Sequence, residues 1–146
     1  MPRPLRSLFA CAAFVTCVAG CKTGTGPSSG ILMQLGDTVF QRPSSGPVIV
    51  PFTITNLTSQ RVYLSRCASR LMTTVDQYTA GQWAEYSGDG CFAIYDMSPL
   101  AVDPGASVTG SRAVAEVGRF RLRAGATKDP QQAFTWDVGL AVFEVR

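Results

Sequence analysis

From Ile31 onward, apolar and polar residues alternate along the chain, and clusters of glycine, proline, serine and asparagine interrupt them about every 8 to 12 positions. Residues 48–55 show the alternation most clearly, because valine, phenylalanine and isoleucine occupy the even positions. A period of two is that of a β-strand with one buried face. No helical spacing and no repeat of about 20 to 50 residues competes with it. The sequence therefore predicts an all-β domain.

The expected strands are short and separated by turns. Residues 31–35 and 38–40 are expected to form one strand interrupted at Gly36-Asp37. The others cover residues 48–55, 61–66, 71–78, 82–86, 91–95, 107–113, 119–123 and 134–145. Two hairpins are expected, one turning at residues 79–81 and one at Ser87-Gly88-Asp89-Gly90. Gly139 lies inside the last strand and indicates a bulge or a close approach of another chain segment. About seven to nine strands in about 115 residues fit two sheets packed face to face, so we expect a two-sheet β-sandwich.

The N-terminal segment has the pattern of an export signal. Arg3 and Arg6 precede an apolar stretch over residues 8–18, and the tetrapeptide Val18-Ala19-Gly20-Cys21 follows it. This tetrapeptide resembles the lipobox of bacterial lipoprotein precursors. We therefore expect a signal peptide over residues 1–20, a flexible Gly/Ser/Thr-rich tether over 21–30 and a single domain over 31–146.

The resemblance to lipoproteins implies that Cys21 receives a diacylglycerol and that its new amino group is acylated, for instance with palmitate. Two or three acyl chains hold a water-soluble domain on a membrane without a transmembrane helix. Lys22 in place of aspartate implies an outer membrane location, on the extracytoplasmic side of the cell envelope. The alternatives are an ordinary secretory signal cut near Gly20, or an uncleaved anchor, although about 11 apolar residues are short of the ~20 that a spanning helix needs.

Charge and cysteine content narrow the class of protein further. Removing Arg3 and Arg6 from the 13 basic residues leaves 11 against 10 acidic ones, which argues against nucleic acid as a partner. Beyond Cys21, the chain holds two cysteines, Cys67 and Cys91. An oxidising compartment would allow them to form a disulfide, and the alternative is two buried free thiols.

Several turn and strand motifs together resemble immunoglobulin-like domains of bacterial surface lipoproteins, and also the intracellular proteinase inhibitor-like Ig domain. The resemblance covers roughly residues 31 to 146 and implies an immunoglobulin-like β-sandwich, but little about activity. The motifs are Gly36-Asp37-Thr38, Phe52-Thr53-Ile54-Thr55-Asn56, Val62-Tyr63-Leu64 before Cys67, Trp83 before Cys91, Asp103-Pro104-Gly105 and residues 118–123.

The chain lacks the residues that most enzyme mechanisms need. The sequence has no histidine, which excludes Ser-His-Asp and Cys-His hydrolases and the H-E-x-x-H proteases. Residues 26–30 match G-x-S-x-G, but they lie in the tether without a preceding strand. Glu85, Asp89 and Asp96 leave open a small glycan-active enzyme, against the plainer interpretation of solubilising surface carboxylates. We expect no catalytic residue, no cofactor and no metal.

Two groups of residues suggest binding. Arg119, Arg121 and Arg123 share one face of a strand, where they would meet phosphates of lipid headgroups or an acidic partner, or form a solvated face. An aromatic group around one hairpin would form a docking surface or belong to the core. Its members are Tyr78, Trp83, Tyr86, Phe92 and Tyr95. Asn56-Leu57-Thr58 matches a glycosylation sequon, a use that does not fit a bacterial lipoprotein.

The leading hypothesis is a lipid-anchored, non-enzymatic immunoglobulin-like module that binds a protein or glycan of the envelope or supports envelope structure. A second hypothesis is a protease inhibitor that presents an exposed loop, either residues 81–90 or residues 124–132. The third is the glycan-active enzyme.

Overall fold

The computed structural model describes residues 30–88, 90–91 and 97–146, with the side chains of residues 136–138 excepted. The predicted signal peptide, Cys21 and the tether up to residue 29 lie outside these residues. The described part of the chain contains no helix, and hence none that could cross a membrane. Its strands are β1 (Ile31–Leu35), β2 (Val39–Phe40), β3 (Val48–Asn56), β4 (Val62–Leu64), β5 (Arg66–Cys67), β6 (Arg70–Leu71), β7 (Thr73–Thr79), β8 (Gln82–Gly88), β9 (Leu100–Val102), β10 (Ser107–Val114), β11 (Gly118–Thr127) and β12 (Thr135–Val145).

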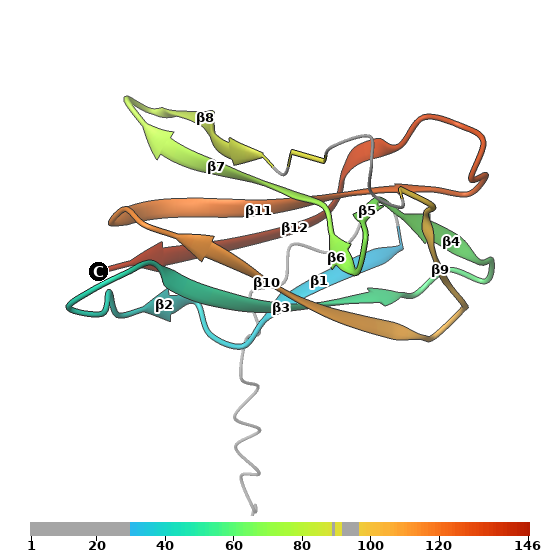
Figure 1. The fold of residues 1–146 in the computed structure, drawn as a ribbon, viewed down its shortest axis with the longest axis horizontal. Coiled ribbons are helices and arrows are strands. Elements are labelled where there is room, and N and C mark those ends of the chain that lie inside the picture. Colours follow the sequence, from blue (N-terminus) through green and yellow to red (C-terminus); the bar gives the residue numbers. More distant parts are fainter. Residues whose placement is uncertain (1–29, 89, 92–96) are drawn as a thin grey trace, which may run out of the picture.

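Two sheets face each other (Figure 1). One is antiparallel with the strand order β1-β3-β10. The larger one has β11 at its centre, with β12 on one side and then β2, which runs parallel to β12. On its other side, β11 pairs with β7 along residues 120–124 and with β4 along residues 126–127. These two neighbours continue the sheet to β8 and to β9.

The chain changes sheet repeatedly along its length. It passes from β1 to β2, from β2 to β3, from β3 to β4, from β9 to β10 and from β10 to β11. These crossings produce the two packed sheets of an immunoglobulin-like β-sandwich, which confirms the predicted fold class. The first crossing is stabilised locally, because the Asp37 side chain accepts hydrogen bonds from the backbone N–H groups of Thr38 (2.6 Å) and Val39 (3.2 Å).

The core consists of the inward-facing residues of both sheets. In β3 the even positions are buried, as the alternation predicted. Phe120 and Phe143 stack with their ring centroids 5.6 Å apart, and Phe40 packs edge-on against Phe143 at 5.8 Å. The sheets approach closely where glycine is present, since a Cβ on Gly139 would lie 3.3 Å from the Cβ of Met33. The strand register also shifts beside Gly139, between Ala124 and Gly125 of β11.

The structure differs from the expected strands at three places. The short strand β9 was not predicted, the strand expected at residues 61–66 is divided between β4 and β5, and the one expected at residues 71–78 is divided between β6 and β7. The strand expected at residues 91–95 lies outside the described residues, except for Cys91, which is not in a strand. The hairpin of β7 and β8 turns at Ala80 and Gly81 as expected, and both residues have positive φ angles (50° and 84°).

The sandwich has two distinct ends. Gly30 lies at one end, where its carbonyl accepts a hydrogen bond from Leu57 (2.8 Å) and where Gly105 bonds Asn56 (2.8 Å). The C-terminus and the β7–β8 turn lie at the opposite end (Figure 1). We call these the Gly30 end and the C-terminal end. Because β11 runs between them for 10 residues, they are about 33 Å apart.

Candidate functional site

The three arginines of β11 lie on the outer face of the larger sheet, because the residues between them, Phe120 and Leu122, are in the core. Arg119 is exposed, whereas the side chains of Arg121 and Arg123 are only 29% and 18% exposed. The expectation of a uniformly solvated cationic face is therefore wrong for Arg121 and Arg123.

The cause of this difference is Asp76 on β7, which the sequence analysis did not single out. Its carboxylate is 2% exposed and lies beside β11, with Asp76 opposite Arg121. Arg121 Nε lies 2.6 Å from Oδ2, and Arg123 donates from Nη2 to Oδ1 (3.0 Å), with its Nε 2.8 Å from Oδ2. Two guanidinium groups thus neutralise one buried carboxylate and are held in place by it.

Arg119 has different surroundings. Its guanidinium carbon lies 5.5 Å from the centroid of Tyr78 and 5.8 Å from that of Trp83. The two rings contact each other across the β7–β8 hairpin, with centroids 5.1 Å apart and planes tilted by 59°. The guanidinium carbon of Arg121 also lies 5.0 Å from Trp83. Cation–π attraction therefore orients both arginines around a single indole ring.

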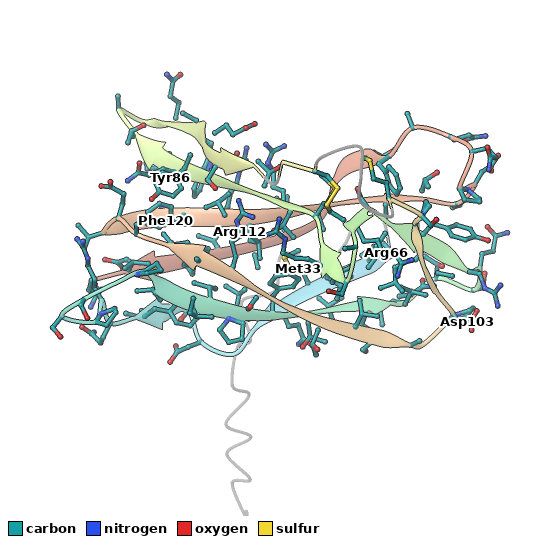
Figure 2. All side chains as sticks on the ribbon, viewed as in Figure 1. Met33, Arg66, Tyr86, Asp103, Arg112 and Phe120 are labelled. Carbon is teal, nitrogen blue, oxygen red and sulfur yellow. A yellow bond between two sulfur atoms is a disulfide. The ribbon has the colours of Figure 1, made fainter. Side chains whose placement is uncertain are left out.

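The aromatic group expected around this hairpin divides into two parts. Tyr78 and Trp83 lie on the outer face, and Tyr78 is 40% exposed. Tyr86 instead is partly buried and packs against Phe120, with centroids 5.4 Å apart (Figure 2), as in the core alternative. Tyr86 is the extra residue where the β7–β8 register shifts between Val75 and Asp76. Phe92 and Tyr95 lie outside the described residues.

Apolar side chains of β12 continue this face. Val142 lies opposite Arg121 and Leu140 lies opposite Arg123, and they are 40% and 37% exposed. The two groups that the sequence analysis treated separately, arginines and aromatic rings, therefore form one surface with an aliphatic border. We call the residues Tyr78, Trp83, Arg119, Arg121 and Val142 the Arg119 surface.

The acidic residues near this surface are directed elsewhere. Glu144 lies opposite Arg119, but it accepts two hydrogen bonds from Arg146, at 3.0 Å and 3.1 Å. These bonds lower the pKa of Glu144, and the charge of Arg119 lowers that pKa further. Glu85 of β8 points along the strand toward Gly88, where a Cβ would lie 3.2 Å from its Oε1. Among the described residues no carboxylate forms an ion pair with Arg119.

The two cysteines of the domain are joined in a disulfide, with their Cα atoms 5.7 Å apart. The bond links β5 to the segment that follows β8. Because β7 and β8 lie between the two cysteines in sequence, the disulfide closes a loop that contains the hairpin of the Arg119 surface.

The features expected for the other hypotheses are not assembled in the described residues. Glu85 is exposed on β8, while Asp89 and Asp96 lie outside those residues. The loop expected at residues 81–90 is mostly strand β8, and residues 124–127 belong to β11, because both segments pair with neighbouring strands. The described part of the chain has no cluster of three potential metal-ligating side chains.

Asn56, the asparagine of the sequon, is 1% exposed and joins β3 to β9. Its Nδ2 donates to the carbonyls of Gln60 (2.8 Å) and Val102 (2.9 Å), and its Oδ1 accepts from the Thr58 backbone N–H (2.9 Å) and hydroxyl (2.7 Å). All of these amide interactions are internal, so Asn56 has a structural role.

No protein family model matches the chain, and no curated protein matches it. Among solved structures, the chain is similar to the ASH or PapD-like domain of human CEP192 (PapD-like domain 7). The identity is 11%, the match covers 95% of this chain and 94% of that chain, and the TM-score is 0.36.

Proposed function

We propose that the chain is a lipid-anchored, non-enzymatic binding module of the bacterial cell envelope, held on a membrane through acyl chains on Cys21. Its contact region is the Arg119 surface. The observation that carries this proposal is the exposed guanidinium of Arg119, which two aromatic rings hold in place while no carboxylate pairs with it in the described residues. Tryptophan, tyrosine and arginine are the side chains that contribute most to protein interfaces.

The position of the surface supports its use by an anchored protein. The tether would join the domain at the Gly30 end, whereas the Arg119 surface borders the C-terminal end, about 33 Å away along β11. A domain held at Gly30 can therefore extend this surface away from the membrane, toward a partner in the envelope. The outer membrane is the expected location, because Lys22 follows Cys21.

The anchor is tested by a Cys21→Ala variant. We expect the parent to fractionate with membranes and its intact mass to report cleavage before Cys21 together with two or three acyl chains. The variant should lose acylation. If Cys21→Ala were processed and retained on membranes like the parent, the lipid anchor would be ruled out.

The contact region is tested separately by photo-crosslinking in cells. A photoreactive phenylalanine analogue at Tyr78 should give one discrete adduct that is lost when Arg119→Ala is added. The matched control places the analogue at Ile49, which is 57% exposed on the other sheet. Equal crosslinking from both positions, or an adduct insensitive to Arg119→Ala, would exclude the Arg119 surface as the contact region.

A further inference from the structure

We infer that the Arg119 surface binds an acidic peptide segment of a protein partner, with a carboxylate on Arg119 and an aliphatic side chain beside it. This inference rests on the proposed function and adds the chemistry of the partner. Among the side chains that the structure describes, the three arginines of β11 share the face with one buried carboxylate, that of Asp76, and Glu144 is bound by Arg146. The excess positive charge is therefore concentrated at Arg119.

The geometry of Arg119 suits a carboxylate. Its guanidinium lies near two aromatic rings, at 5.5 Å and 5.8 Å from their centroids, and cation–π contacts leave the N–H donors available. A guanidinium presents these donors as a planar fork that binds a carboxylate with two parallel hydrogen bonds. Because Tyr78 and Trp83 already restrict the side chain, less conformational entropy is lost on binding.

The surroundings favour a peptide over a membrane surface. Anionic membranes are recognised by clusters of about four to eight lysines or arginines. Here Arg121 and Arg123 are committed to Asp76, so the face offers far fewer available cations. Val142 and Leu140 instead place exposed aliphatic groups next to the arginines. A peptide can satisfy both features, with a carboxylate at Arg119 and an apolar side chain at Val142.

The orientation of the domain supports the same choice. The tether joins at Gly30, and the surface borders the opposite end of the sandwich. With acyl chains on Cys21, as proposed, the headgroups of that membrane would be closest to the end that lacks the Arg119 surface.

The test measures fluorescence anisotropy with the full mature chain reconstituted in phosphatidylcholine nanodiscs. The probe is a fluorescein-labelled peptide of alternating glutamate and leucine, and its matched control has glutamine in place of glutamate. We expect the glutamine peptide to bind at least about tenfold more weakly, as for loss of one charge-assisted hydrogen-bonded pair. The variant R119Q should weaken the glutamate peptide by a similar factor, and R119K by less, because lysine keeps the charge but not the fork.

The control variant is R61Q, which removes an equally charged residue paired with Asp103 at the Gly30 end. It should leave peptide affinity unchanged. Equal binding of the two peptides, equal effects of R119Q and R61Q, or no binding at all would overturn the inference. The inference would also be overturned if the protein tethered phosphatidylglycerol vesicles in an Arg119-dependent way but did not bind the peptide. None of these results bears on the Cys21→Ala and crosslinking experiments, so failure of the peptide chemistry is distinguishable from failure of the proposed function.

Discussion

Replacing Asp76 by asparagine would remove the negative charge that two arginines share while nearly preserving the shape of the side chain. The carboxylate accepts hydrogen bonds from Arg121 (2.6 Å) and Arg123 (3.0 Å) and is 2% exposed. Hydrogen bonds to charged groups contribute about 1.5–3 kcal/mol each. The two guanidinium groups are partly exposed and would be rehydrated in the variant, so we take the low end of this range for each of the two hydrogen bonds. The expected loss is about 3 kcal/mol, consistent with about 3–5 kcal/mol for breaking a buried ion pair.

This loss is a large part of the free energy of unfolding, which is about 5–15 kcal/mol for domains of this size. Urea unfolding followed by tryptophan fluorescence measures it. With a slope of about 1.5 kcal/mol per molar, the midpoint should fall by about 2 M. The matched control is Asp103→Asn, which breaks an exposed ion pair with Arg61 and should leave the midpoint nearly unchanged. If Asp76→Asn shifted the midpoint no more than Asp103→Asn, the ion pairs of Asp76 would not stabilise the sheet.

Three further predictions concern stability and charge. The double variant Cys67→Ala, Cys91→Ala should lose about 3.5 kcal/mol of stability, because the disulfide closes a loop between residues 24 positions apart. A urea midpoint equal to that of the oxidised parent would contradict this. Gly110→Ala should destabilise the domain by about 1–3 kcal/mol, because the added Cβ would overlap the buried Phe52 ring. The control Gly90→Ala meets no atom within 4 Å and should be neutral, so equal melting temperatures for the two variants would refute the close packing of Gly110 on Phe52. Glu144 should titrate below the usual glutamate range in an NMR pH titration, and Arg146→Gln should raise its pKa, so an unchanged titration in this variant would disprove the assignment. Because the pKa of Glu144 is lowered in the folded state, the stability that the pair contributes is present above the unfolded-state pKa and is lost as the pH falls through the folded-state pKa.

The strands were largely predictable because their determinants are local. The even positions of β3 are apolar and buried, and the residues between β7 and β8 include a glycine with positive φ. Alternation and turn chemistry depend on neighbours in sequence, which are visible in one chain. The partition into sheets is not local: β1 and β2 look like one interrupted strand, but they pair with β3 and β12 respectively.

The candidate site was predictable in its members but not in its arrangement. Arg119, Tyr78 and Trp83 were identified from two separate patterns, and only the pairing of β7 with β11 brings them together. Asp76 was not predicted, because its partners Arg121 and Arg123 lie 45 and 47 residues away in sequence. A signal in the sequence does exist: Asp76 is an acidic residue inside an expected strand, and it would share a sheet face with the three arginines of β11 if the two strands were neighbours. The sequence left Tyr86 open between a docking surface and the core, because the one-residue shift in register that directs it toward Phe120 depends on strand pairing.

The pairing of β1 has a mechanical consequence for an anchored domain. β1 starts at the Gly30 end and runs antiparallel to β3 from Ile31 to Leu35. Tension between the tether and a partner bound at the C-terminal end would act nearly parallel to these strands, so the hydrogen bonds between β1 and β3 would resist sliding together and would not open one at a time. Force spectroscopy should therefore find a higher rupture force when the domain is pulled between Gly30 and Arg146 than when it is pulled between Gly30 and Gly105, which lie at the same end. Similar forces in the two geometries would disprove this load sharing.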